Sequence, residues 1–220
     1  MNIITAAIFD VDGLMLDTER IAKSAWQKAL AEWDLTISDE LYRNLVGRNI
    51  HDVKLLLRDH FGDGFPLDRA YEKKHHHMQQ HISNYGILIK PGLIDLLDFL
   101  KSAGVKMAVA SSSPSNFVNE KLTSVGIRSR FKTIVCGDQI RHGKPAPDIF
   151  LEVARELGAQ PSQCVVLEDS EAGIRGASAA GMLPIMIPDM KEPSPEVANL
   201  AFRVLHSLHD AKSIFINLLA

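Results

Sequence analysis

Acidic side chains stand at the ends of two apolar runs of the sequence. Asp10 and Asp12 follow the first run, and Glu168 and Asp169 end a later one. Carboxylates a few ångströms apart raise one another's pKa unless a counter-charge is present. A hard divalent cation is the natural counter-charge, and Mg²⁺ keeps open positions for water and a phosphate oxygen. If the fold joins the two pairs, they predict a magnesium site; alone, Asp-x-Asp fits an acidic turn equally well.

Two further segments carry groups that can hold a phosphate. Ser111 and Ser112 follow another apolar run and precede Pro114, and Lys144 lies in GKPAPDIF, residues 143–150. Alone, the serines are typical of a helix N-terminus and the lysine of a solvated surface charge. Together with the acidic groups they supply a carboxylate nucleophile, a metal site, an ammonium group and a hydroxyl anchor. Those are the parts that form and hydrolyse an aspartyl-phosphate.

The elements that must position these groups follow a repeated pattern. Continuous apolar runs at residues 3–9, 105–110, 133–136, 164–167 and 184–187 indicate strands covered on both faces, as in a parallel sheet. Helical patterns alternate with them at residues 93–103, 117–125, 148–157 and 172–180, each followed by a glycine. The alternation predicts a doubly wound α/β fold, with the four segments at the carboxyl ends of its strands.

Residues 19–88 interrupt that alternation. They contain helical patterns at 21–33, 39–46, 52–60 and 68–83, with no strand between them. A βα connection usually takes only about two to six residues. We therefore expect an inserted all-helical cap at residues 17–88, with the core formed by residues 1–16 and 89–220. The chain crosses between the two near residues 16–18 and 87–92, which are the expected hinges.

Composition excludes several classes of protein. The 220 residues are 46% hydrophobic and carry a net charge of −3, which favours a globular chain without a basic face for nucleic acid or membrane. No apolar run approaches the roughly 18 residues of a membrane span, and the N-terminus lacks the basic region of a signal peptide. Cys136 and Cys164 lie in apolar runs, so we expect buried free thiols and a cytoplasmic protein.

The motifs in their order resemble the haloacid dehalogenase superfamily, and the resemblance covers essentially the whole chain. The matching segments are FDVDGLMLDTE at 9–19, VASSS at 109–113, GKPAPDIF at 143–150 and LEDSEAG at 167–173. The sequence looks most like the capped phosphatases of that superfamily, the group containing β-phosphoglucomutase, sugar-phosphate phosphatases and pseudouridine-5′-phosphate phosphatases. The resemblance implies a Rossmann-like core with the helical cap inserted after the first motif.

The resemblance also implies a role for each motif residue. Asp10 would be the nucleophile, and Asp12 would protonate the leaving oxygen and then activate water. Ser111, Ser112 and Lys144 would bind the phosphate.

The same resemblance implies the ligands of the metal. Asp10, the backbone carbonyl of Asp12 and Asp169 would form the Mg²⁺ shell. Glu168 would lie close behind, bound directly or through water.

Selectivity must come from the cap, because the core contacts only a phosphoryl group. Trp26, Gly47, Arg48 and His51 are the candidate substrate-binding residues, although the helical spacing of Trp26 favours packing within the cap. The run His75–His77 could be taken for a metal site. Neighbouring helix residues point about 100° apart, so a solvated helix face is the better interpretation.

The expected function is that of a Mg²⁺-dependent phosphomonoester hydrolase, a monomer acting on a small phosphorylated sugar, polyol or nucleoside. A sugar-phosphate mutase is the alternative, but the resembling mutases carry charged or polar residues where this chain has Val46, Ile50, Pro114, Ser115 and Ala22. A non-catalytic phosphate-binding or phospho-accepting signalling module is the alternative from another class. Such a module would not need the cap, and no motif residue is missing.

Overall fold

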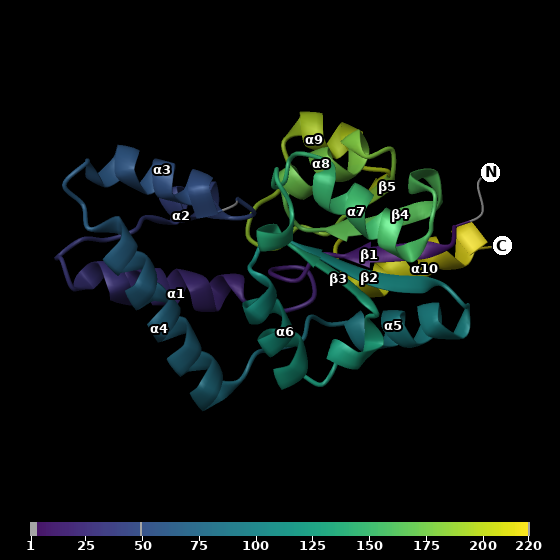
Figure 1. Ribbon diagram of the computed structural model, residues 1–220, viewed down its shortest axis with the longest axis horizontal. Helices are drawn as coiled ribbons and strands as arrows, with labels where there is room; N and C mark the ends of the chain where they lie inside the picture. The colour runs from purple at the N-terminus through teal and green to yellow at the C-terminus, as the bar shows by residue number, and fades with distance from the viewer. Residues whose placement is uncertain (1–3, 49, 220) are drawn as a thin grey trace.

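The protein is described from a computed structural model, in which residues 4–48 and 50–219 are placed. A sheet flanked by helices forms one part of this molecule, and a group of helices lies to one side of it (Figure 1). Ile3, where the first predicted strand begins, and Asn49, in the predicted cap loop, lie outside the described residues.

The sheet is parallel and has, within the described residues, six strands in the order β3-β2-β1-β4-β5-β6. The strands are β1 (Ala6–Phe9), β2 (Lys106–Ser111), β3 (Thr133–Cys136), β4 (Cys164–Glu168), β5 (Leu183–Met186) and β6 (Arg203–Val204). Phe9 at the end of β1 pairs with Val109 of β2 and Leu167 of β4. Strand order reverses beside β1, which is where doubly wound sheets bind their ligands. The predicted fold class is confirmed, and β6 is an additional strand.

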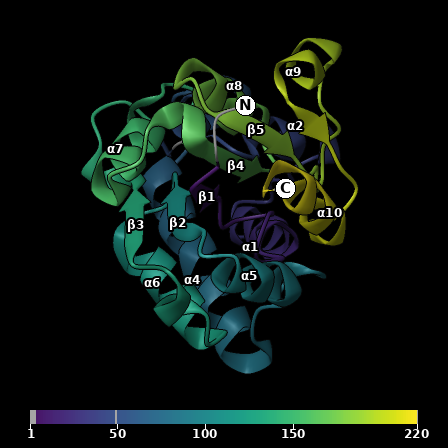
Figure 2. The ribbon, with the colours of Figure 1, turned by 90° about the vertical axis from the view of Figure 1, so that its right-hand side faces the viewer.

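Helices cover both faces of the sheet, as Figure 2 shows. The side chain of Ile8 packs with α7 (Asp148–Leu157) and α8 (Glu171–Ala179) on one face. Ala7 and Phe9 belong to the opposite layer, which contains α5 (Leu93–Ser102), α6 (Ser115–Ser124) and α10 (Leu208–Leu219). The short helix α9 (Pro195–Leu200) packs beside α8. Burial on both faces explains why the strands read as continuous apolar runs.

The segment between β1 and α5 is helical throughout its regular elements. It contains α1 (Glu19–Ala31), α2 (Asp39–Leu45), α3 (Ile50–Phe61) and α4 (Leu67–Tyr85). Helices α1 and α4 lie side by side, and Trp26 meets Tyr71 edge to face with ring centroids 5.8 Å apart. Trp26 is 3% exposed, so it does pack in the core of this helical group.

The two chain segments that join the helical group to the core lie side by side. The Asp17 N–H donates to the Leu88 carbonyl (2.9 Å), and the Lys90 N–H donates to the Met15 carbonyl (2.9 Å). Because paired backbone segments can bend together, we propose them as the hinges of a cap formed by residues 17–88. The buried side chain of Asp189 stabilises this region, because it accepts a hydrogen bond from the Lys90 ammonium (2.6 Å).

Cys136 and Cys164 are both free and buried, as predicted. Burial raises the pKa of the Cys136 thiol to about 12 and that of Cys164 to about 11, so neither is a ready thiolate. Within residues 4–48 and 50–219, no helix has both the length and the apolar character that crossing a membrane requires.

Candidate active site

Lys144 is the centre of the predicted site and is 2% exposed. Its ammonium group donates to Asp10 Oδ1 (2.6 Å), to the Ala110 carbonyl (3.0 Å) and to the Glu168 carboxylate. Burial opposes the charge of Lys144, but the carboxylates of Asp10 and Glu168 outweigh it and hold the lysine pKa above its ordinary range. One buried cation therefore ties the end of β1 to the end of β4.

Glu168 is fully buried and its two oxygens are already occupied. Oε1 accepts from Lys144, while Oε2 accepts from the backbone N–H (3.0 Å) and the hydroxyl (2.8 Å) of Ser170. Gly173 makes this burial possible, because a Cβ there would lie 1.9 Å from the Glu168 carboxyl carbon. Three donors occupy the Glu168 carboxylate, which therefore holds the Lys144 ammonium group in place.

Asp10 lies at the carboxyl end of β1 and is 8% exposed. Burial raises its pKa to about 7, against the opposing charge of Lys144 and with the help of Glu168. A single lysine shared by two carboxylates leaves negative charge uncompensated. A further cation would favour the ionised, nucleophilic form of Asp10.

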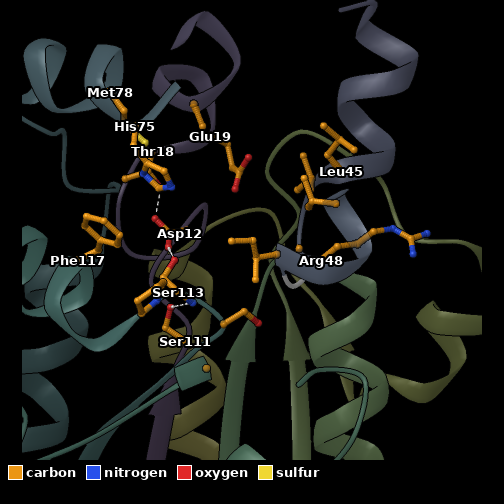
Figure 3. A pocket seen from close by; sticks show the side chains of 18 of the residues that line it. Asp12, Thr18, Glu19, Leu45, Arg48, His75, Met78, Ser111, Ser113 and Phe117 are labelled. Carbon is orange, nitrogen blue, oxygen red and sulfur yellow. Dashed lines mark hydrogen bonds between the residues drawn. The ribbon is translucent and has the colours of Figure 1, made fainter. Parts of the chain in front are cut away.

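Asp12 occupies a different environment at the same edge of the sheet. Its Oδ1 accepts from the Lys121 ammonium (2.5 Å) and the Thr18 hydroxyl (2.7 Å), and Oδ2 accepts from the Ser113 hydroxyl (2.8 Å), as Figure 3 shows in part. Burial would raise the pKa of Asp12, but Lys121 and these hydrogen bonds lower it to about 2. The two aspartates of the first motif thus differ in environment: before metal and substrate bind, Asp10 holds a proton more readily than Asp12, the reverse of what an ionised nucleophile and a protonated acid require.

Lys121 was not among the predicted site residues. It lies on α6 and is only 9% exposed, between the buried side chains of Val118 and Leu122. A lysine on the core-facing side of a helix, three residues after one apolar position and directly before another, is the signal that could have found it.

Asp169 is 6% exposed and stands beside these groups. Burial and the charges of Glu168 and Asp10 raise its pKa well above the ordinary value. No described side chain donates a hydrogen bond to its carboxylate or forms an ion pair with it. Its Oδ2 would lie 2.2 Å from a Cβ at Gly13, so only glycine lets it approach the first motif this closely.

These donors fit a small, hard divalent cation. Asp10 and Asp169 supply two buried carboxylates with uncompensated charge. Among the described residues, no three His, Cys, Asp or Glu side chains converge as a complete metal cage. Mg²⁺ does not need one, because it is usually held by one or two carboxylates together with water and substrate phosphate.

The predicted residues of the core, except the fully buried Glu168, open into one cavity of about 810 Å³ (Figure 3). Its lining includes Asp10, Asp12, Ser111, Ser112, Lys144 and Asp169. Ser111 is fully buried, and its hydroxyl accepts the Ser113 N–H at 3.2 Å. The site is thus a polar edge of the sheet beneath a cavity large enough for a small metabolite.

The predicted cap residues line the same cavity but differ in what they contact. Arg48 is exposed, donates from Nε to the Asn44 carbonyl (2.8 Å) and points away from Asp12 in Figure 3. Gly47 has φ +75°, and a Cβ there would lie 2.4 Å from the Cβ of Ser170. Gly47 therefore allows the cap loop to touch the core beside the predicted metal ligands.

The prediction of a solvated face for His75–His77 is wrong for His75. Its ring stacks on Phe117 of the core, with centroids 5.0 Å apart and planes 8° from parallel, and it lines the cavity. Burial and nearby Lys74 lower its pKa to about 4. His76 is exposed. The Nε2 atom of His77 lies 3.8 Å from Oε1 of Glu32. The three rings point to different surroundings, as their helical spacing requires.

The cavity also receives cap side chains that sequence analysis did not single out. Glu19 contacts the Tyr42 hydroxyl through Oε2 (2.6 Å), and burial raises the pKa of Glu19. Lys74 faces the same space, where burial and the charge of Lys121 lower its pKa to about 8.

Comparison with known proteins agrees with this geometry. Residues 7–187 match the model of the haloacid dehalogenase-like hydrolase family. The chain is 34% identical to a probable pseudouridine-5′-phosphatase of Drosophila melanogaster, with 95% of this chain and 92% of the relative covered. It is 29% identical to a phosphorylated carbohydrates phosphatase of Thermotoga maritima, covering 95% of this chain and 89% of the relative.

A solved structure shows the same architecture. The crystal structure of a β-phosphoglucomutase from Clostridium difficile superposes with a TM-score of 0.82 at 28% identity, covering 97% of this chain and 96% of that one. The chain therefore belongs to the haloacid dehalogenase-like hydrolases and is a phosphatase of that family.

Proposed function

We propose that the protein is a Mg²⁺-dependent phosphomonoesterase that releases phosphate from a small phosphorylated sugar, polyol or nucleoside through an aspartyl-phosphate. One observation carries the proposal. Lys144 joins Asp10 to Glu168 while Asp169, without a partner among the described residues, stands beside them in the same cavity as Asp12.

In the first half-reaction an Asp10 oxygen attacks phosphorus, the bond from phosphorus to the ester oxygen breaks, and the leaving oxygen takes a proton from Asp12. Bound Mg²⁺, held by Asp10, the Asp12 carbonyl and Asp169, would neutralise phosphoryl charge. Lys144 and Ser111 hold the phosphoryl oxygens in place. Asp12 must first take up a proton, because Lys121 and the hydroxyls of Thr18 and Ser113 favour its ionised state.

In the second half-reaction Asp12 removes a proton from water, and that water attacks the phosphoryl group on Asp10. The ionised state of Asp12, favoured by Lys121, is the state that this base requires. The two states of one carboxyl group thus serve the two steps.

Hydrolysis is favoured over mutase chemistry by the cap side of the cavity. A mutase must hold a second phosphate, which calls for paired cations or hydrogen-bond donors. Val46, Ile50 and Pro114 line the cavity at the positions where the resembling mutases carry such groups. Arg48 points away from Asp12 and does not replace them.

The site is built from one chain, which supports a monomer as the working form. Core and cap residues of the same molecule line the cavity. The buried free thiols of Cys136 and Cys164 suit the reducing cytoplasm that we propose as its location.

The proposal is tested by phosphate release from p-nitrophenyl phosphate with Mg²⁺ and with a chelator, followed by a panel of sugar, polyol and nucleoside monophosphates. We expect Mg²⁺-dependent turnover that Asp10→Asn abolishes. Turnover of similar rate in chelator, or in Asp10→Asn, would contradict it.

A further inference from the structure

Two buried lysines contact the two aspartates of the first motif separately. Lys144 donates to Asp10, whereas the Lys121 ammonium lies 2.5 Å from Oδ1 of Asp12. Lys144 also holds the phosphoryl oxygens in the proposed chemistry. Among the described carboxylates, Asp12 is the one that forms an ion pair with Lys121. The role of Lys121 therefore has to be sought in what this contact does to Asp12.

Donors on both carboxylate oxygens fix the orientation of Asp12. Oδ1 accepts from Lys121 and from the Thr18 hydroxyl (2.7 Å), and Oδ2 accepts from the Ser113 hydroxyl (2.8 Å), two contacts that lie within the view of Figure 3. Contacts at both oxygens restrict rotation of the carboxyl group. The Asp12 side chain is still 20% exposed and lines the cavity, so water can reach it. Asp12 is thus an oriented carboxylate that water can approach.

Lys121 is the charged donor of the three, and it belongs to the core. A hydrogen bond between two ionised groups is stronger than one from a neutral hydroxyl. Helix α6, which carries Lys121, packs against β3 of the sheet. Thr18, by contrast, lies directly before α1, in the segment that joins core and cap. The contact between Lys121 and Asp12 therefore does not depend on the position of the cap.

We propose that Lys121 is a positioning residue for the second half-reaction, because it holds Asp12 where the attacking water must lose its proton. In this step the water oxygen bonds to phosphorus, the bond from phosphorus to the Asp10 oxygen breaks, and the water proton passes to Asp12. Inorganic phosphate leaves, and Asp10 is a carboxylate again. Lys121 thereby shortens the lifetime of the phosphoryl group on Asp10. This inference rests on the proposed phosphatase function.

The test measures the two half-reactions separately, with p-nitrophenyl phosphate and Mg²⁺. The value of kcat/KM reports the steps up to release of p-nitrophenol, which needs no proton from Asp12. The rate constant for hydrolysis of the phosphoenzyme is kcat divided by the fraction of enzyme that is phosphorylated at saturating substrate. Acid quenching and mass spectrometry of the peptide containing Asp10 give that fraction.

The variants are Lys121→Met, Asp12→Asn and the two substitutions combined. Methionine suits position 121, because Lys121 is only 9% exposed and lies between the buried side chains of Val118 and Leu122. Lys101→Met, at an exposed lysine of α5, is the matched control. Lys121→Gln, which keeps a polar end, is the second variant if circular dichroism shows that Lys121→Met folds poorly.

We expect Lys121→Met to lower the rate constant for phosphoenzyme hydrolysis by roughly 10- to 100-fold, the worth of a hydrogen bond to a charged group. Its kcat/KM should stay within about threefold of the wild type. Asp12→Asn should slow hydrolysis further, and the combined variant should be no slower than Asp12→Asn, because Lys121 acts through Asp12. Lys121→Gln should show the same pattern by a smaller factor, and Lys101→Met should match the wild type.

An unchanged rate constant for phosphoenzyme hydrolysis in Lys121→Met would overturn the inference. An equal fall in kcat/KM would also overturn it, because Lys121 would then act on the substrate or on the first step. Additive losses in the combined variant would show that Lys121 does not act through Asp12. Failure of the proposed function looks different: the wild type would release no p-nitrophenol, or Asp10 would carry no phosphoryl group in any variant.

Discussion

Replacing Lys144 with methionine removes the one cation that two buried carboxylates share. Methionine keeps much of the length and volume of the side chain but leaves Asp10 and Glu168 facing each other without a counter-charge. Removing one partner of a buried ion pair typically costs about 3–5 kcal/mol. That is a large part of the roughly 5–15 kcal/mol by which domains are stable.

The loss of folding stability in this variant should be larger at high pH than at low pH. Asp10 has a pKa raised from its ordinary value to about 7 even with Lys144 present, so without the lysine it rises further. A carboxyl group with a raised folded-state pKa destabilises the fold when ionised, and that cost grows as pH rises above the unfolded value of about 4. The variant should therefore lose about 3–5 kcal/mol at pH 8 and clearly less at pH 5.

The assay is urea unfolding of metal-free protein, followed by circular dichroism at both pH values. Lys132→Met, at an exposed lysine, is the matched control and should change the free energy of unfolding by less than about 0.5 kcal/mol. A loss for Lys144→Met below about 1 kcal/mol at pH 8, or a larger loss at pH 5 than at pH 8, would refute the reasoning.

Three further substitutions test separate parts of the site. Asp12→Asn should lower kcat/KM for a sugar phosphate by about 10²–10⁴-fold but much less for p-nitrophenyl phosphate, whose leaving group needs no proton; an equal loss on both would argue against the acid role. Asp169→Ala should weaken Mg²⁺ binding in titration calorimetry, and an unchanged isotherm would remove it from the metal shell. Gly47→Ala places a Cβ 2.4 Å from that of Ser170 and should raise KM, while Gly86→Ala, with a similar φ of +76° and open space around it, should not; the same KM in both variants would contradict the cap contact.

The sequence was sufficient for the core of the fold because its strands are buried on both faces. Each predicted strand appears, with ends shifted by a few residues at most in the described chain, such as β5 at Leu183–Met186. Strand β6 could not be found in this way. It consists of Arg203 and Val204, which are both exposed, and a two-residue exposed strand has no apolar pattern.

The core side of the site was predictable because parallel strands bring their carboxyl ends to one edge. Asp10, Lys144 and Asp169 accordingly meet there. Partners that depend on helix packing were not predictable from spacing alone. Lys121 reaches Asp12 across 109 positions of sequence, and His75 reaches the cavity only because α4 turns that face toward Phe117.

The central claim is that Asp10 carries the phosphoryl group during turnover. The most direct measurement is rapid acid quenching of the enzyme mixed with p-nitrophenyl phosphate and Mg²⁺, followed by digestion and mass spectrometry of the peptide containing Asp10. The account predicts one phosphoryl group on Asp10, more of it in Asp12→Asn because the water-activating base is lost, and none in Asp10→Asn. Steady turnover with no phosphorylated peptide, or a phosphoryl group on Ser111 in place of Asp10, would contradict it.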